Sequence, residues 1–282
     1  MKAQDLYDRL DKDFDVAHST DFDWPLDYNE YVNPKFKERQ NGILLDNSQE
    51  IKEVYTSVFP SNYVLELLLD MNKCDVLLFT HHAMVWDIRK APEVFCNINL
   101  NLLPILKEER VSVYALHLPL DVNGPYSTSI NLAKAVGVEP QEDFCDYFGK
   151  KVAVFGKTNL KTASQMVECL SQAVGHRSKL WLYGDETIKD SRVAVAAGGG
   201  CQDFVIEEIV QNGINLLVTG VTALNKYSEK AHSIAKQHGV NIIGGTHYST
   251  EKFACIAMCD YFNGFGLFCK FLEDKFVLED LE

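Results

Sequence analysis

Short apolar segments rich in β-branched and aromatic residues recur along the chain and alternate with amphipathic ones. Helices are predicted where apolar residues recur three and four positions apart, over 62–72, 163–174, 204–211 and 222–238. The apolar segments have the length of buried strands and lie at 74–80, 111–117, 151–157, 179–184, 192–197, 214–220 and 241–247. This alternation of strands with helices predicts an α/β architecture.

The two halves of the chain carry a weak internal repeat. LELLLDMNKCDVLLFTHH in the first half resembles VIEEIVQNGINLLVTGVT in the second, each reading as a helix, a turn and a strand that ends at a threonine. Between them, the polar, proline-containing segment 138–143 is the best candidate for a boundary. We therefore predict two related α/β lobes, 1–138 and 139–282, or one compact unit built from both.

Residues with metal-ligand chemistry follow three of the predicted strands. A pair of histidines ends one strand, and two others end in a histidine followed four positions later by a carboxylate. The set is His81, His82, His117, Asp121, His247 and Glu251. Two like lobes facing each other across a pseudo-twofold axis would bring these strand ends together, so we expect a site between the lobes.

The adjacent histidines favour two metal ions over one. Successive side chains of extended backbone point apart, so His81 and His82 would serve separate ions, and Glu251 could bridge them. Imidazole and carboxylate ligands without thiolates suit Fe, Mn, Zn or Ni, and the sequence does not choose among these. Each motif alone is also typical of strand-end capping or a local hydrogen bond; their recurrence at three strand ends favours the metal site.

Several other features have structural readings. The glycines 198–200 suit a tight turn better than a phosphate cradle, because no Walker lysine or complete GxGxxG accompanies them. Trp86 and Asp87 suit packing as well as a substrate pocket. The acidic runs 11–15 and 21–27 are expected on solvated surface. The remaining histidines have no carboxylate at a comparable spacing at the end of a strand. We expect them to be surface or structural residues: His18, His176, His232 and His238.

Composition excludes some classes of protein. The net charge of −13 over 282 residues argues against a nucleic-acid backbone binder. No segment is apolar enough to cross a bilayer, and MKAQDLYDRLDKDFDV lacks the apolar region of a secretory signal. Eight cysteines without a CxxC pair suggest reduced thiols, and Cys255 and Cys259 are read as helix packing. We expect a cytoplasmic protein with no membrane partner.

Three motifs together resemble the Nif-three-like dinuclear metal proteins, also known as GTP cyclohydrolase I type 2 homologues. They are the double histidine in LLFTHHAMVW, the element YALHLPLD and the element GGTHYSTE, and the resemblance covers residues 41–257. It implies paired α/β lobes with two metals between them, assembled into a homo-hexamer. By its pattern His82 and Asp121 would bind one ion and His81 and His247 the other. Glu251 would bridge the ions, and His117 would stand beside them, either supporting the ligands or transferring a proton.

The chain departs from the family pattern at three places. Ala83 stands where the family usually has proline, and Thr246 where it has glycine before the last histidine. The family's Thr-Gly-Glu element, followed by a histidine pair, is here Thr219-Gly220-Val221 without such a pair.

Two functions remain compatible with these residues, so the sequence leaves open whether the protein is an enzyme. The first is a metal-dependent hydrolase of a small, nucleotide-like substrate, in which His117 moves a proton. The second is a non-enzymatic hexamer that stores, delivers or senses metal. A scaffold whose metals only stabilise the fold is a weaker third reading.

Overall fold

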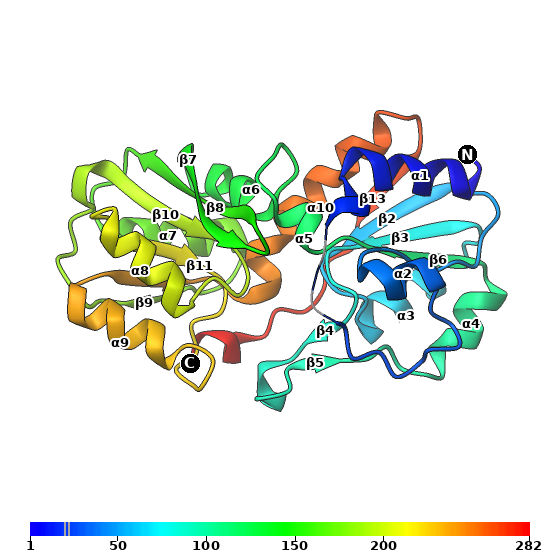
Figure 1. Ribbon diagram of the computed structural model, residues 1–282, viewed down its shortest axis with the longest axis horizontal. Coiled ribbons are helices and arrows are strands. Elements are labelled where there is room, and N and C mark those ends of the chain that lie inside the picture. Colours follow the sequence, from blue (N-terminus) through cyan, green and yellow to red (C-terminus); the bar gives the residue numbers. More distant parts are fainter. Residues whose placement is uncertain (20, 22) are drawn as a thin grey trace. The chain divides into compact units, whose positions relative to one another are not determined.

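The computed structural model describes residues 1–19, 21 and 23–282, and these divide into two compact units (Figure 1). Unit 1 comprises Met1–Leu120 and Cys255–Lys275, and unit 2 comprises Asp121–Ala254 and Phe276–Glu282. The division passes through one long helix, α10 (His247–Asn263). Each unit has its own sheet.

Unit 1 is built on a five-stranded sheet in the order β1-β6-β3-β2-β13. Four strands are parallel, and β1 is antiparallel to β6. Every position of β3 and β6 is buried, as expected for parallel strands covered on both faces. The strands are β1 (Gly42–Leu45), β2 (Glu53–Ser57), β3 (Val76–Thr80), β6 (Val111–Ala115) and β13 (Phe268–Phe271), and a separate pair is β4 (Val85–Trp86) with β5 (Phe95–Cys96).

Helices cover both faces of this sheet. On one face α2, α3 and α4 bury Phe36, Leu65 and Leu103 against β-strand residues such as Leu78. On the other, Phe262 of α10 packs on Phe79, and α1 lies against Tyr114. The helical segments of unit 1 are α1 (Ala3–Asp13), α2 (Pro34–Arg39), α3 (Asn62–Asp70), α4 (Leu102–Glu108), α5 (Leu118–Asp121, whose last residue falls in unit 2), and the 3-10 turns η1 (Val16–His18) and η2 (Ile88–Lys90).

Unit 2 is built on a six-stranded sheet in the order β7-β8-β10-β11-β12-β9. Its central strands β10, β11 and β12 are parallel, while β7, β8 and β9 run antiparallel to their neighbours. The strands are β7 (Val138–Tyr147), β8 (Lys150–Thr158), β9 (Lys179–Trp181), β10 (Arg192–Ala196), β11 (Leu216–Thr219) and β12 (Asn241–Gly244).

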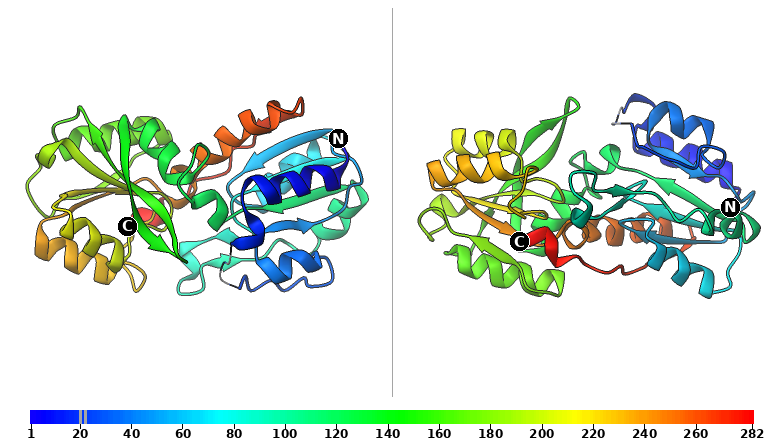
Figure 2. Two further views of the ribbon diagram at one scale, coloured as in Figure 1. Left: turned by 45° about the horizontal axis from the view of Figure 1, so that its top comes forward. Right: turned by 90° about the horizontal axis from the view of Figure 1, so that it is seen from below.

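Two pairs of helices cover the unit 2 sheet. The pair α8 and α9 packs on the face that carries Leu217 and Ile242, and α6 and α7 pack on the face that carries Val218 and Ile243. Figure 2 (right) shows the yellow-to-orange pair and the green α7 on opposite sides of this sheet. The helical segments are α6 (Thr128–Ala135), α7 (Ala163–Val174), α8 (Asp203–Gln211), α9 (Glu229–His238), and the 3-10 turns η3 (Lys189–Ser191) and η4 (Leu278–Leu281).

The repeat predicted from the sequence is present in the topology. Unit 1 has the order β2-α3-β3-α4-β6 along the chain, and unit 2 has β10-α8-β11-α9-β12. In both, three parallel strands lie side by side, and an antiparallel strand pairs with the last of them. The α/β fold is confirmed.

The predicted boundary segment 138–143 is in fact the start of β7. Proline is tolerated there because β7 is an edge strand with an irregular register between Pro140 and Glu142. The compact units divide after Leu120 instead, because α6 packs on the unit 2 sheet. Unit 1 also gains 255–275, since β13 pairs with β2. Asp121, expected in the first lobe, therefore falls in unit 2.

Helix boundaries differ from prediction at two places. The helix predicted over 222–238 begins only at Glu229, after a non-helical segment held by backbone hydrogen bonds to Asp280. The strand predicted over 241–247 ends at Gly244, and His247 is the first residue of helix α10. Within the described part of the chain, no helix has the length and apolarity that a bilayer crossing requires.

Candidate metal centre

The double histidine follows β3 directly and is held by the neighbouring strand. The amides of His81 and His82 donate to the carbonyls of Ser57 (3.3 Å) and Val58 (2.9 Å), just past the end of β2. Both side chains are fully buried, at 0% and 1% exposure. The parallel pairing of β2 with β3 therefore fixes the backbone that presents the two imidazoles.

A carbonyl oxygen defines the tautomer of His81. The Nδ1 atom of His81 lies 3.0 Å from the carbonyl oxygen of Leu116, which can only accept, so Nδ1 carries the proton. The lone pair of the neutral ring is then on Nε2, the usual orientation of a metal-ligating histidine whose other nitrogen bonds a carbonyl. The neighbouring ring of His82 packs at 4.7 Å on Phe59 and meets the edge of Trp24 at 5.9 Å.

His117, just past the end of β6, is oriented by a buried carboxylate. Its Nδ1 lies 2.8 Å from Oδ2 of Asp21, whose side chain is fully buried. The same oxygen accepts from the amide of Leu118 (3.1 Å) and from Asn41 (3.2 Å), and Asn41 accepts from the amide of His117 (2.8 Å). These bonds hold both the backbone and the ring of His117.

The three imidazoles of unit 1 form one cluster. Ring centroids are 4.4 Å apart for His81 and His82, 4.8 Å for His82 and His117, and 5.1 Å for His81 and His117. One nitrogen from each ring lies within 4.8 Å of the others. Three converging neutral imidazoles are a donor set suited to a divalent transition metal, so this buried group could hold an ion.

Unit 2 has a buried histidine and a buried carboxylate near the start of α10. His247 Nε2 lies 3.1 Å from Oε1 of Glu251, four residues later on the same helix face, and both side chains are about 5% exposed. The amide of His247 donates to the buried carboxylate of Asp280 (2.8 Å). The carboxyl terminus of the chain thus fixes the start of α10.

Gly198 leaves room for the Glu251 carboxylate. A Cβ at this position would overlap Oε1 of Glu251 and lie 2.8 Å from its Cδ and 3.1 Å from Cδ2 of His247. Gly198 also has φ of +61°, a conformation that favours glycine, and its amide donates to Oγ1 of Thr250 (3.0 Å). The glycine segment is thus a tight turn, as expected, and it forms one wall around Glu251.

Asp121 ends α5 and is oriented by the next helix. Its Oδ1 accepts a hydrogen bond of 2.6 Å from the hydroxyl of Thr128, the first residue of α6.

The prediction that the acidic segments are solvated surface is wrong for Asp21 and Asp11. Asp21 is buried beside His117. Asp11 accepts from the buried Tyr114 hydroxyl (2.7 Å) and pairs with Arg39 (3.0 Å). A run of carboxylates looks the same in a sequence whether or not a partner from a distant strand reaches it, so neither residue carries a signal. Phe22, within the second run, lies outside the described residues.

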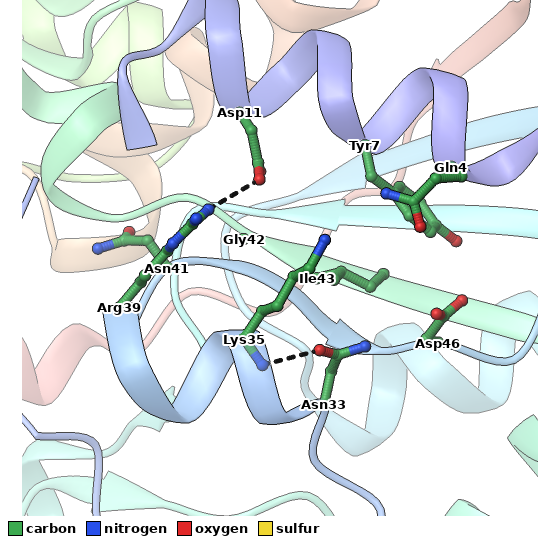
Figure 3. Close-up of a pocket in the computed structure, with 10 residues that line it drawn as sticks. All are labelled: Gln4, Tyr7, Asp11, Asn33, Lys35, Arg39, Asn41, Gly42, Ile43 and Asp46. Carbon is green, nitrogen blue, oxygen red and sulfur yellow. Dashed lines mark hydrogen bonds and ion pairs between the residues drawn. The ribbon is translucent and has the colours of Figure 1, made fainter. Parts of the chain in front are cut away.

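A small polar pocket lies between α1, α2 and β1 (Figure 3). It encloses about 50 Å³. Asn41 lines it and also bonds Asp21, so the pocket adjoins the support of His117. Two acidic and two basic side chains line the pocket, so it has no net positive charge to attract an anion: Asp11, Asp46, Lys35 and Arg39.

The other candidates have structural partners. Asp87 bonds Arg89 through both carboxylate oxygens, and Trp86 packs on Phe95 at 5.5 Å. His232 bonds the Tyr183 hydroxyl and the Thr222 carbonyl, and burial lowers its pKa. His176 contacts Ser249 at 2.7 Å.

Fold and site define a class: α/β proteins of two related units in which buried histidines and a glutamate could hold a metal ion. Residues 28–273 match the model of the family Duf34/NIF3 (NGG1p interacting factor 3). The chain belongs to this family.

Relatives with similar sequences carry the name GTP cyclohydrolase 1 type 2 homolog. One from Archaeoglobus fulgidus is 29% identical over 76% of this chain and 80% of its own length. Another from Borreliella burgdorferi is 26% identical over 100% of this chain and 96% of its own. Among solved structures, protein ybgI, described as of unknown function, superposes with a TM-score of 0.75 at 18% identity, over 98% of this chain and 99% of its own. At that identity the likeness shows the fold.

Proposed function

We propose that the protein is a metal-dependent hydrolase of a small, nucleotide-like molecule. Two divalent ions, drawn from Fe, Mn, Zn and Ni, would be bound as the family resemblance implies. The ligands would be His81, His82, Asp121, His247 and Glu251. When bound, such ions supply Lewis acidity, which makes water a better nucleophile near neutral pH and polarises the bond to be cleaved.

The donor set of each unit supports this assignment. The imidazoles of His81 and His82 are buried side by side, and the tautomer of His81 puts its lone pair on Nε2. In the other unit, Glu251 is buried beside Gly198, where any larger residue would displace its carboxylate. Nitrogen and oxygen donors without thiolates match the metals named above.

The contact between His117 and Asp21 carries the proposal of catalysis. Nδ1 of His117 donates to the Asp21 carboxylate, so in the neutral ring Nε2 can take a proton from water and return it to a leaving group. The carboxylate fixes the tautomer and stabilises the imidazolium while the proton is held.

Assembly and location belong to the same proposal. The family resemblance implies a homo-hexamer. Within the described residues all cysteines are free thiols, which fits the reducing cytoplasm. The charge of −13 makes nucleic acid an improbable partner.

A hydrolysis screen tests the proposal. The purified chain, stripped with a chelator and reloaded separately with each of the four metals, is given GTP, other nucleotides and phosphoesters. We expect turnover that is lost on chelation, returns with metal, and falls in His117→Asn but not in His238→Asn, an exposed control. Stoichiometric metal binding without turnover of any substrate would favour the metal-handling alternative.

A further inference from the structure

Two cysteine thiols of unit 1 are in direct contact. Cys259 lies on the second half of α10 and Cys269 on β13, ten positions later, and their side chains hydrogen-bond each other. Neither cysteine forms a disulfide in this structure. The two elements lie next to each other in Figure 1.

The sheet register supports this contact independently. Cys269 pairs with Val54, and Phe271 pairs with Thr56, in the parallel ladder of β13 and β2. Because side chains alternate along a strand, Cys269 and Thr56 point to the same face. Cys259 contacts the Thr56 hydroxyl at 3.4 Å, and that hydroxyl donates to a carbonyl of α10 (2.8 Å). Helix α10 and strand β13 therefore present both thiols on the same face of the unit 1 sheet.

The two thiols differ in pKa and in exposure to solvent. The hydrogen bond from Cys269 lowers the pKa of Cys259 against the opposing effect of burial, and the Thr56 hydroxyl lowers it further. The same contact raises the pKa of Cys269. Cys259 is half-buried, whereas Cys269 is buried. A thiolate within reach of a small oxidant, next to a protonated thiol, is the arrangement of a redox-active cysteine and its resolving partner.

We propose that Cys259 and Cys269 form a reversible intramolecular disulfide when the protein meets a hydroperoxide. The Cys259 thiolate attacks a peroxide oxygen, the O–O bond breaks, and Cys259 becomes a sulfenic acid while hydroxide or alkoxide leaves. The sulfur of Cys269 then attacks the sulfenic sulfur, the S–O bond breaks, and the hydroxyl group leaves as water with the thiol proton. Two thiols are oxidised by two electrons, and the peroxide is reduced by two.

The disulfide would tie a helix to the edge of a sheet. β13 is the outermost strand of the unit 1 sheet, joined to it only through β2 in the described ladder. A covalent link from β13 to α10 closes a short loop and restrains this edge. A redox signal would thus act on the helix that begins at His247 and carries Glu251.

Peptide mapping of the oxidised full-length chain tests the proposal. The protein is treated with hydrogen peroxide, its remaining thiols are alkylated, and the digest is analysed by mass spectrometry. We expect a Cys259–Cys269 linked peptide as the main product, removed by dithiothreitol. In Cys269→Ser, dimedone should label a sulfenic acid at Cys259. Cys169→Ser, which alters a half-buried cysteine elsewhere, should leave the linkage unchanged.

Two results would overturn the proposal. One is wild-type protein in which Cys259 keeps its thiol while Cys74 or Cys96, also half-buried, is oxidised. The other is a disulfide that joins Cys259 to Cys255 or to a second chain. Both are read from the wild-type protein, so neither depends on a variant that folds.

Discussion

Replacing Gly198 with alanine should destabilise the protein and displace Glu251. The variant Gly137→Ala serves as the control for the backbone contribution. Gly198 has φ of +61°, and Gly137, also in unit 2, has φ of +69°. Alanine in this left-handed region costs about 1–2 kcal/mol at either position. A Cβ at Gly137 would meet nothing within 4 Å, so Gly137→Ala measures the backbone effect alone.

At Gly198 the added Cβ also displaces a buried carboxylate. It would overlap Oε1 of Glu251 and lie 2.8 Å from its Cδ, so the 3.1 Å contact with His247 cannot persist. A hydrogen bond to a charged group contributes about 1.5–3 kcal/mol. Gly198→Ala should therefore lower the free energy of unfolding by about 1.5–3 kcal/mol more than Gly137→Ala does.

Urea unfolding of the metal-free variants, followed by circular dichroism, measures this difference. Metal content after reloading gives a second readout, and only Gly198→Ala should lose metal, because only it moves a ligand. Equal destabilisation by the two alanines, with equal metal content, would refute the reasoning. It would mean that Glu251 relaxes without cost and that its position beside Gly198 has no role in binding.

Three further predictions follow from single contacts. Asp21→Asn keeps the shape of the residue that bonds His117 but removes its charge. The kcat should fall by about 10²-fold or more, while the metal content stays unchanged. An unchanged kcat would show that Asp21 has no part in the mechanism. Burial lowers the pKa of His232 below its ordinary 6.5, so the unfolded chain takes up a proton that the folded chain does not. The free energy of unfolding should therefore fall as the pH drops below about 6.5, and fall less steeply in His232→Gln, as urea unfolding at pH 8 and pH 5 would reveal. Iodoacetamide should alkylate Cys259 faster than Cys169 at pH 7.5, because a hydrogen bond lowers the pKa of the Cys259 thiol and burial raises the pKa of the Cys169 thiol. Mass spectrometry of timed samples measures the two rates, and the reverse order would contradict this prediction.

The sequence predicted the elements whose pattern is local. The helix predicted over 163–174 from its apolar spacing has these bounds in the structure, where a capping box of Thr162 and Gln165 sets its start. The buried strands were expected because apolar residues fill both faces of β3, β6 and β11. Contacts between distant residues explain the failures. The segment 138–143 is a strand only because β8 pairs with it, and 222–228 is not helical because Asp280 binds its backbone.

The sequence singled out the buried histidines but not the residues that orient them. Histidines at strand ends stand out because polar residues interrupt an apolar pattern. Asp21, Asn41 and Asp280 lie far along the chain from the histidines they orient, and only the fold brings them near. Thr246, which replaces the family glycine, keeps the left-handed backbone with φ of 64°. Its hydroxyl accepts from the Ser249 amide at 3.3 Å, so the threonine caps α10.

Metal content per chain tests the central claim most directly. Protein purified and reloaded with each of the four metals is measured by elemental analysis as wild type, as Glu251→Gln, and as Glu207→Gln, an exposed control on α8. The account predicts about two ions per chain in the wild type and the control, and fewer in Glu251→Gln, which loses the bridging charge. A wild-type chain that binds none of the four metals, or a Glu251→Gln chain that keeps both ions, would contradict it.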